Sequence, residues 1–295
     1  MRAELQQLLE SRVKQCVSQQ RSKGDCDKIE RKKASLAKRD AEIVKAKAKG
    51  QITDITEIND FKNVSYAVHF RYLIRQNDLL YIEEEVESHQ ATFSREHLID
   101  EFEVVPSINS AKFDDRSLLY SDDFSMNELG QRAYTYDRLK AVQYAERWWN
   151  SYNPAYMKIE NNDCTNFISQ CLQQGGAPMR GYPNRGAGWW LRSQSHSWSW
   201  AVAHALKLYF ESSKSGLRAK RVSSPEQLLL GDVICYDFEG DGRFNHNTIV
   251  TGKDANGMPL VNAHTYNSRQ RYWAYEDSSA YTPNIKYLFF SIVDS

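Results

Sequence analysis

The sequence lacks several features that would define its class at once. No apolar run approaches the roughly 18 residues that a membrane span needs, and the opening stretch "MRAELQQLLESRVKQ" has no apolar core of a secretion signal. We therefore expect a cytoplasmic protein without a membrane span, with export by a route that needs no such signal left open. The five cysteines show neither zinc-like spacing nor a disulfide framework. We expect free thiols in a reducing compartment, and no metal or organic cofactor.

The chain also lacks a net charge, but its charges are unevenly distributed. Lys and Arg outnumber Asp and Glu by 14 to 7 in residues 1–50, although the whole chain has a formal net charge of zero. A basic segment can contact nucleic acid or another anionic polymer. This one holds none of the aromatic residues that accompany basic patches in single-strand binding. We therefore expect a solvated helix pair there and no nucleic-acid partner.

Residues 1–105 have the pattern of a small α+β domain. Helical spacing of apolar residues predicts helices over 3–22 and 26–48, which suit an antiparallel helical hairpin. Apolar residues then alternate from Val64 to Ile74, and "LLYIEEEVES" and "FEVV" provide two further strands of an antiparallel meander. The layout is similar to cystatin-like or nuclear-transport-factor-like folds. Residues 106–126 are rich in Ser and Asp and are expected to form a linker.

Residues 127–295 predict a second domain, with helices first and an antiparallel sheet after them. Helical periodicity covers 127–150, a helix begins at Cys164, and another surrounds "SWAVAHALKLYF". The strands expected beyond them are "DVICYDF", "NTIVTG", "PLVNAHT" and "YLFFSIV". This order is typical of the α+β class.

Cys164 lies at a helix start, in "NNDCTNFISQ", where a thiol can act as a nucleophile. Asn162 or Asp163 can cap the helix, which places Cys164 in its first turn. The free N–H groups there carry partial positive charge, which lowers a thiol pKa and can stabilise an oxyanion. Burial as core filler is the ordinary role of a free cysteine, and we assign that role to the other four.

A thiol nucleophile also needs a histidine base and a polar group that orients the base. His246 opens the strand "HNTIVTG", and an Asn-Gly turn leads to "PLVNAHT", where Asn262 and His264 share one face. In an antiparallel hairpin these two can sit beside His246. We therefore predict Cys164 as nucleophile, His246 as base and His264 as orienter, with Asn262 as the substitute for the last role.

The ordered motifs "NDCTNFISQ", "LLLGDVICYDFEGDGRFNHNTIVTG" and "LVNAHT" resemble the putative amidase domain of Gram-positive bacteria. That family is similar to the NlpC and CHAP cell-wall peptidases and amidases, which are papain-like. The resemblance covers residues 127–295 and implies a papain-like fold, with the nucleophile at Cys164 and the base at His246. Asn166 stands where NlpC-type enzymes have Gly, which favours the putative amidase subgroup. NlpC-type enzymes also place a tyrosine near the oxyanion, about a dozen residues before the cysteine. Tyr152 stands at that distance and Tyr156 close to it, and an aromatic residue packed under the loop is the alternative.

The Gly- and aromatic-rich loop from Gly175 to Trp190 offers substrate contacts, chiefly through Trp189 and Trp190. A hydrophobic wall without such a role is the alternative for these tryptophans. The predicted activity is hydrolysis of an amide bond through a cysteine thioester. The resemblance implies a peptidoglycan-type amide, in a stem peptide or at its sugar link, with cell-wall fragments as substrate. The alternatives are acyl or peptidyl transfer by the same dyad, and a catalytically inactive binding module.

Overall fold

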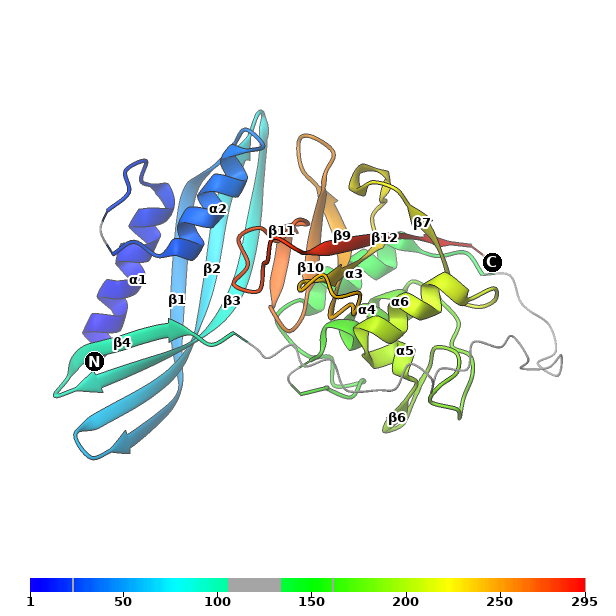
Figure 1. The fold of residues 1–295 in the computed structure, drawn as a ribbon, viewed down its shortest axis with the longest axis horizontal. Coiled ribbons are helices and arrows are strands. Elements are labelled where there is room, and N and C mark those ends of the chain that lie inside the picture. The colour runs from blue at the N-terminus through cyan, green and yellow to red at the C-terminus, as the bar shows by residue number, and fades with distance from the viewer. Residues whose placement is uncertain (23, 106–133, 161, 295) are drawn as a thin grey trace. The chain divides into compact units, whose positions relative to one another are not determined.

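The computed structural model describes residues 1–22, 24–105, 134–160 and 162–294, which divide into two compact units (Figure 1). The first unit comprises the described part of Met1–Pro106, with Asp254–Asn256 and Tyr266–Tyr281. The second comprises the described part of Ser107–Lys253, Gly257–Thr265 and Thr282–Ser295. Two short segments from the C-terminal half of the sequence thus belong to the first unit. The expected linker, 106–126, lies outside the described residues.

The first unit combines two helices with an antiparallel sheet. Its elements are α1 (Arg2–Val17), α2 (Asp27–Ala37), β1 (Ala41–Ile58), β2 (Phe61–Gln76), β3 (Leu79–Ser94), β4 (His97–Glu103) and β11 (Ser268–Tyr272). The strands run in the order β1–β2–β3–β11, and β4 also pairs with β3. The helix pair and the meander that the sequence predicts are both present.

The second helix expected from the sequence, residues 26–48, is wrong beyond its first half. α2 ends at Ala37, and β1 begins at Ala41. Within β1, Ala46 and Ala48 pair with large aromatic residues of β2. Ala and Lys favour helix locally, but the pairing with β2 outweighs that preference because it extends a sheet with a buried apolar face.

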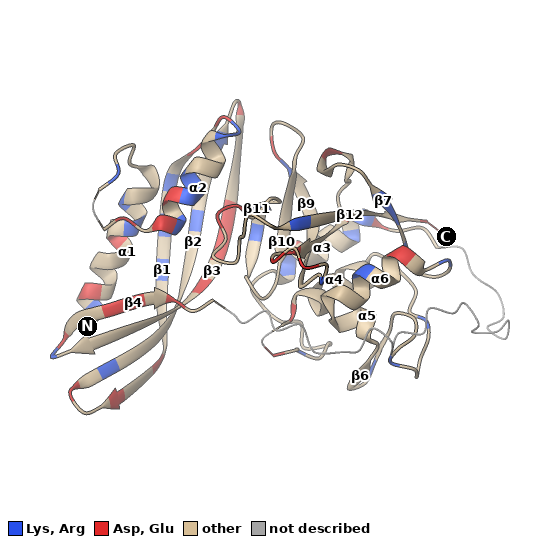
Figure 2. Cartoon of the chain, in the orientation of Figure 1, with Lys and Arg blue, Asp and Glu red and all other residues tan. Residues whose placement is uncertain are grey.

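Buried charges lie between α2 and β3 in the first unit. Lys28 and Lys32 on α2 face Glu83, Glu85 and Glu87, which occupy alternate positions on one face of β3. Figure 2 shows both signs of charge on α2 and acidic residues along β3. Lys32 Nζ contacts Glu83 and lies 3.3 Å from Glu85. A buried charge is tolerated only when an opposite charge pairs with it, so the lysines of α2 and the glutamates of β3 each depend on the other for stability.

The second unit packs helices against one antiparallel sheet. Its helices are α3 (Arg138–Trp148), α4 (Cys164–Gln174), α5 (Trp198–Ala201) and α6 (Ala203–Ser212), with a short 3-10 turn at Pro225–Gln227. Its strands are β7 (Arg218–Val222), β8 (Val233–Asp237), β9 (His246–Lys253), β10 (Pro259–Ala263) and β12 (Lys286–Val293), with a small hairpin of β5 (Leu191–Arg192) and β6 (Ser195–His196). The sheet order is β10–β9–β8–β12–β7.

α4 is the central helix of the second unit. Its residues are almost all buried, including Phe167, Ile168 and Leu172, which join one apolar core with Ile249 of β9. A helix that is buried on nearly every side can hold its first residue in a fixed position relative to the sheet. The four strands predicted for the C-terminal half of the sequence are present, whereas β5, β6, β7 and β11 were not predicted. The mixed architecture and the large antiparallel sheet agree with the expected α+β class.

Candidate functional site

Cys164 is the first residue of α4, as the sequence predicts, and Asp163 occupies the N-cap position. Asp163 does not cap the helix with its side chain. Instead, Oγ1 of Thr265 accepts hydrogen bonds from the backbone N–H groups of Asp163 (3.1 Å) and Cys164 (3.2 Å). Thr265 has a φ of 75°, a region that β-branched residues rarely adopt. A strained residue in the turn after β10 thus satisfies the N–H groups at the start of α4.

The thiol of Cys164 is buried, with 1% of the residue exposed. It donates to Oδ1 of Asn162 at 3.4 Å, and its sulfur lies 3.7 Å from Oγ1 of Thr165. Burial raises the pKa of Cys164, although hydrogen bonds from Thr165 and from the backbone of Asn247 oppose the change. We expected a lowered pKa, and that expectation is wrong for this closed arrangement because desolvation of the thiolate outweighs its hydrogen bonds.

His264 is held at both ring nitrogens beside the cysteine. Nδ1 lies 2.7 Å from Oδ2 of Asp163, and Nε2 lies 2.8 Å from the carbonyl oxygen of Trp148 at the end of α3. Its ring stacks on Phe167, with centroids 3.9 Å apart. The carbonyl oxygen can only accept, so Nε2 carries a proton. Oδ1 of Asp163 also accepts two N–H donors, which suits an ionised carboxylate.

This arrangement changes the role that His264 can play. Both of its ring nitrogens are engaged with Asp163 and Trp148, so neither is available to orient a second imidazole. The predicted orienter role is therefore not supported by the geometry. His264 instead fixes the turn that precedes Cys164, because Asp163 links the ring directly to the residue before the thiol.

His246 is the first residue of β9 and is buried. It pairs with Tyr236 of β8, and the two ring centroids are 5.6 Å apart. The next residue, Asn247, points to the opposite face, where Oδ1 accepts from Thr165 of α4 (2.8 Å) and Nδ2 donates to the sulfur of Cys235 (3.0 Å). The backbone of Asn247 reaches the Cys164 sulfur. The strand therefore directs Asn247 toward α4 and the side chain of His246 to the other face.

The expected cross-strand pair of His246 and His264 is not formed, and the register explains why. Asn262 of β10 pairs with Ile249 of β9. Continuing that pairing beyond Ala263 places His264 opposite Asn247 and Thr265 opposite His246. A shift of one residue reverses the face on which every side chain lies. The sequence suggests neighbouring histidines, but the register that would join them differs from the observed one by one position.

The side chain of Asn262, the substitute orienter, is also hydrogen-bonded to other residues. Its Oδ1 accepts from Oγ1 of Thr251 at 2.7 Å, and its Nδ2 donates to Oε1 of Glu146 on α3 at 2.9 Å. The residue is fully buried. Asn262 therefore ties β10 to α3, and the geometry does not support a role in holding a catalytic imidazole.

Tyr152 lies beside His264, the residue before Thr265. Its ring meets that of His264 edge-on, with centroids 5.1 Å apart, and Nζ of Lys158 lies 4.6 Å from the centroid of the Tyr152 ring. Tyr152 is 41% exposed, and burial of its hydroxyl region raises its pKa to about 12. A neutral phenol at the surface can donate a hydrogen bond to a bound molecule.

Trp189 and Trp190 are core residues and do not offer the substrate surface that we expected. Both are almost fully buried, and Nε1 of Trp189 donates to Oγ of Ser169 on α4 at 2.9 Å. Nε1 of Trp190 donates to the carbonyl oxygens of Asn184 (3.1 Å) and Ala187 (3.2 Å). Their indole N–H groups are thus used within the fold, and the hydrophobic-wall alternative describes them better.

Sequence reasoning missed several polar residues that position the cysteine. Asn166 donates to Oδ1 of Asp163 (2.8 Å) and to the carbonyl of Met157 (2.9 Å), and it accepts from Nε1 of Trp200 (2.8 Å). The polar pair Thr165-Asn166, which follows Cys164 in the motif, was a signal for this network, because a polar side chain that becomes buried needs hydrogen-bond partners. Thr265 carried no such signal, because its φ and its cap position depend on the tertiary fold.

Among the described residues, no group of three or more His, Cys, Asp or Glu is arranged to hold a metal ion. An acidic residue of the turn before β9 stabilises the turn itself. The carboxylate of Asp237 accepts the backbone N–H groups of Gly240 (2.7 Å) and Gly242 (2.8 Å). Those bonds shape the turn that leads into His246.

The sequence that forms most of the second unit matches a known family. The profile described as "Putative amidase domain" matches residues 135–290, so the chain belongs to that family and carries an amidase-type domain. The match includes all of the residues described above around Cys164. In the part of the chain that the structure describes, no helix has both the length and the apolar character needed to cross a membrane.

Two curated relatives are from Bacillus subtilis strain 168. The uncharacterized protein YhbB is 52% identical over 298 residues, covering 98% of this chain and 95% of the relative. The uncharacterized protein YjcM is 30% identical over 140 residues, covering 45% of this chain and 31% of the relative. No solved structure matches this chain. The similarity to YhbB extends over both units, and neither relative's name states an activity.

Proposed function

We propose that the second unit hydrolyses an amide bond through a thioester on Cys164. The observation that supports this most is the position of the thiol in a chain of the amidase family. Cys164 is the first residue of α4, and the backbone of Asn247 reaches its sulfur. Partial positive charge at a helix N-terminus favours a thiolate once the sulfur is exposed to substrate and solvent.

The proposed base is His246. His246 is the residue before Asn247, and the backbone of Asn247 contacts the thiol. Thr265, opposite His246 in the continued register, accepts the N–H of Cys164 at 3.2 Å. The imidazole lies on the face of β9 opposite the side chain of Asn247, so the proposed proton transfer requires the start of β9 to move toward the thiol when the site opens. His264 and Asp163 act as positioning residues that hold the turn before Cys164.

The proposed reaction moves one proton at a time. The Cys164 thiol gives its proton to His246 as the sulfur attacks the carbonyl carbon. The N–H of Cys164, released from Thr265, then stabilises the oxyanion. The C–N bond breaks, and the amine leaves with the proton from His246. Water, deprotonated by His246, attacks the thioester, which releases the acid and restores the thiol.

The closed arrangement implies an opening step before the reaction. Cys164 is 1% exposed, and burial raises its pKa, so the resting thiol is protonated and inaccessible. Release of the bonds from Cys164 to Asn162 and Thr265 would expose both the sulfur and the oxyanion donor. Gating of this kind is common where an active site must exclude water between turnovers.

The proposed substrate is a peptidoglycan-type amide, in a stem peptide or at its link to the sugar. This part rests on the similarity of the sequence motifs to NlpC- and CHAP-type enzymes. Cell-wall fragments of defined composition are therefore the substrates to test, with product amines and acids identified by mass spectrometry. Cys164→Ala is expected to abolish product formation, and Cys26→Ala, which removes a thiol in the first unit, is expected to retain it.

Two other functions would use the same site. Acyl or peptidyl transfer needs only an amine in place of water, and an added amine acceptor would then appear in the product. A binding module without catalysis is favoured by one observation, the burial and raised pKa of the thiol. Saturable binding of wall fragments without turnover, unchanged in Cys164→Ala, would replace the hydrolase proposal with that function.

A further inference from the structure

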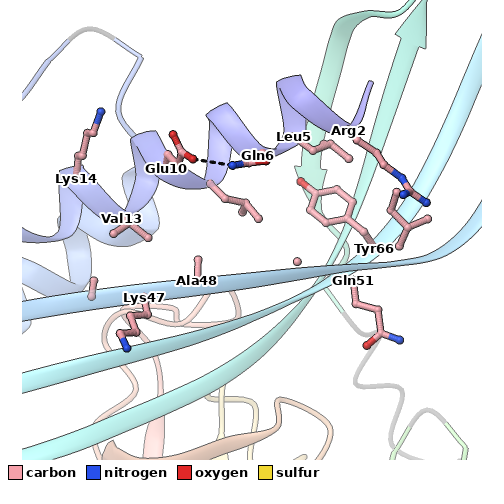
Figure 3. Close-up of a pocket in the computed structure, with 14 residues that line it drawn as sticks. Arg2, Leu5, Gln6, Glu10, Val13, Lys14, Lys47, Ala48, Gln51 and Tyr66 are labelled. Carbon is pink, nitrogen blue, oxygen red and sulfur yellow. Dashed lines mark hydrogen bonds between the residues drawn. The ribbon is translucent and has the colours of Figure 1, made fainter.

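A large cleft lies in the first unit, between α1 and the edge strand β1 (Figure 3). Its volume of about 890 Å³ is within the range of sites that bind ligands. Leu5, Leu9 and Val13 line it from α1. No residue of the amidase family match lines this cleft, because the match begins at residue 135. The cleft is therefore a feature of the first unit alone.

Small side chains on β1 create the space beneath α1. Ala46, Ala48 and Gly50 occupy alternate positions on the face that points toward the helix, where they pair with buried residues of β2. A Cβ on Gly50 would come within 2.9 Å of Cδ1 of Leu9. The helix thus touches the strand at Gly50. A run of small residues within a strand marks a place where another group approaches the backbone closely.

The cleft extends to the outer edge of β1. Lys47 and Gln51, whose side chains alternate with the small residues, also line it. Among the described residues, β1 is the first strand in the sheet order and pairs with β2 only. Its other edge therefore presents backbone N–H and C=O groups that can pair with an added strand. Figure 3 shows the apolar side chains of α1 above this strand.

The opposite face of the same strand is basic. Lys45, Lys47 and Lys49 are exposed and point away from α1, because they alternate with the small residues of the cleft. A strand added at this edge would place its side chains alternately against the apolar cleft and beside these lysines. Pairing of β1 with β1 of a second copy would bring two rows of lysines together, and like charges across strands are destabilising.

We propose that β1 and α1 bind an extended peptide segment of a partner by strand addition. The recognised segment alternates apolar and acidic side chains, with the apolar ones in the cleft and the acidic ones beside Lys45, Lys47 and Lys49. Main-chain hydrogen bonds provide affinity in this mode, and the alternate side chains provide specificity. The site is independent of the amidase chemistry and needs no reaction at Cys164.

The test uses the full chain and three capped nine-residue peptides, followed by fluorescence anisotropy. The first alternates valine with glutamate, the second alternates valine with lysine, and the third is the first peptide with every backbone amide methylated. Only the first is expected to bind saturably, because the second has the wrong charge and the third cannot pair as a strand. Equal binding of the first and third peptides would overturn strand addition.

Variants identify the surface. The double variant Lys47→Glu/Lys49→Glu keeps the fold, because both side chains are exposed. It is expected to bind the glutamate peptide at least about tenfold more weakly than the parent and to bind the lysine peptide in preference. Ala48→Phe fills the cleft and should abolish binding of either. Lys220→Glu, an exposed lysine on β7, is the matched control and should change nothing. Absence of saturable binding, or self-association through β1 seen by light scattering and lost in the double variant, would overturn the proposal.

Discussion

The carboxylate of Asp163 and the imidazole of His264 meet at 2.7 Å, although the two residues are 101 positions apart in the sequence. The pair is buried and lies directly before Cys164. It joins the turn that begins α4 to the residue after the end of β10. The position of the thiol therefore depends on a contact that closes a long loop of chain.

Asp163→Asn tests the importance of this pair. The substitution keeps the size of the side chain but removes the negative charge that faces His264. Loss of one partner of a buried pair leaves the other uncompensated, so we expect the free energy of unfolding to fall by about 3 kcal/mol. Urea denaturation provides the measurement, with the exposed Asp78→Asn as control. A variant as stable as that control would show that the contact contributes little.

Thr265 provides the second prediction. Thr265→Val keeps the branched shape but leaves the N–H groups of Asp163 and Cys164 without their shared acceptor. Loss of a helix cap costs about 1–2 kcal/mol, and we expect a loss of that size in thermal or urea unfolding. Thr265→Ser, which retains the hydroxyl, should recover most of it. Equal stability of the two variants would mean that the hydroxyl does not act as the cap.

The buried charges of the first unit predict a loss of stability in acid. Burial opposes ionisation of Glu87 and Glu101, but Lys28 lowers the pKa of Glu87, and His89 with Arg12 lowers that of Glu101, each to about 2. Both values lie below the ordinary 4.5, so the stabilisation is present above pH 4.5 and is lost as the pH falls toward 2. The Glu87 carboxylate contributes at most ~3 kcal/mol, and the partly exposed Glu101 carboxylate contributes less because solvent screens its interactions.

The contribution of His89 to stability depends on pH in the opposite direction, because its pKa is raised. Burial alone would lower its pKa, but hydrogen bonds to Glu101 and Glu87 raise it above the ordinary 6.5. Its contribution is complete below pH 6.5 and is lost as the pH rises through the raised value. Unfolding of Glu101→Gln, measured between pH 2 and 8, should therefore depend less on pH than unfolding of the parent. The exposed Glu57→Gln should follow the parent, and parallel curves for all three would contradict the assignment.

Much of the fold follows from sequence patterns, because these reflect local burial. The alternation from Val64 to Ile74 marks a face that lies buried in β2. The polar residues before Cys164 mark the start of α4, although the side chain of Asp163 does not cap it. The helix expected through residue 48 was wrong because Lys- and Ala-rich segments carry little information about burial. Their state was decided by pairing with β2, which lies later in the chain.

The site was predictable in its residues but not in its contacts. Cys164, Tyr152 and His264 do gather at the start of α4. The contacts of His264 do not support the orienter role expected of it. A strand pattern does not reveal register, and the continued register places His264 opposite Asn247 rather than His246. The bond from Thr265 to Cys164 could not be foreseen either, since it depends on a strained φ that sequence patterns do not reveal.

The most direct test of the account is the rate of Cys164 alkylation by iodoacetamide in the folded protein, followed by peptide mass spectrometry from pH 5 to 9. The account predicts that Cys164 reacts faster than the buried Cys171 and Cys235 under native conditions, because local opening exposes it. His246→Ala should slow this reaction near neutral pH, because the base that removes the thiol proton is lost. Reaction of Cys164 no faster than Cys171, in parent and variant alike, would contradict the proposal of an activated thiol at this site.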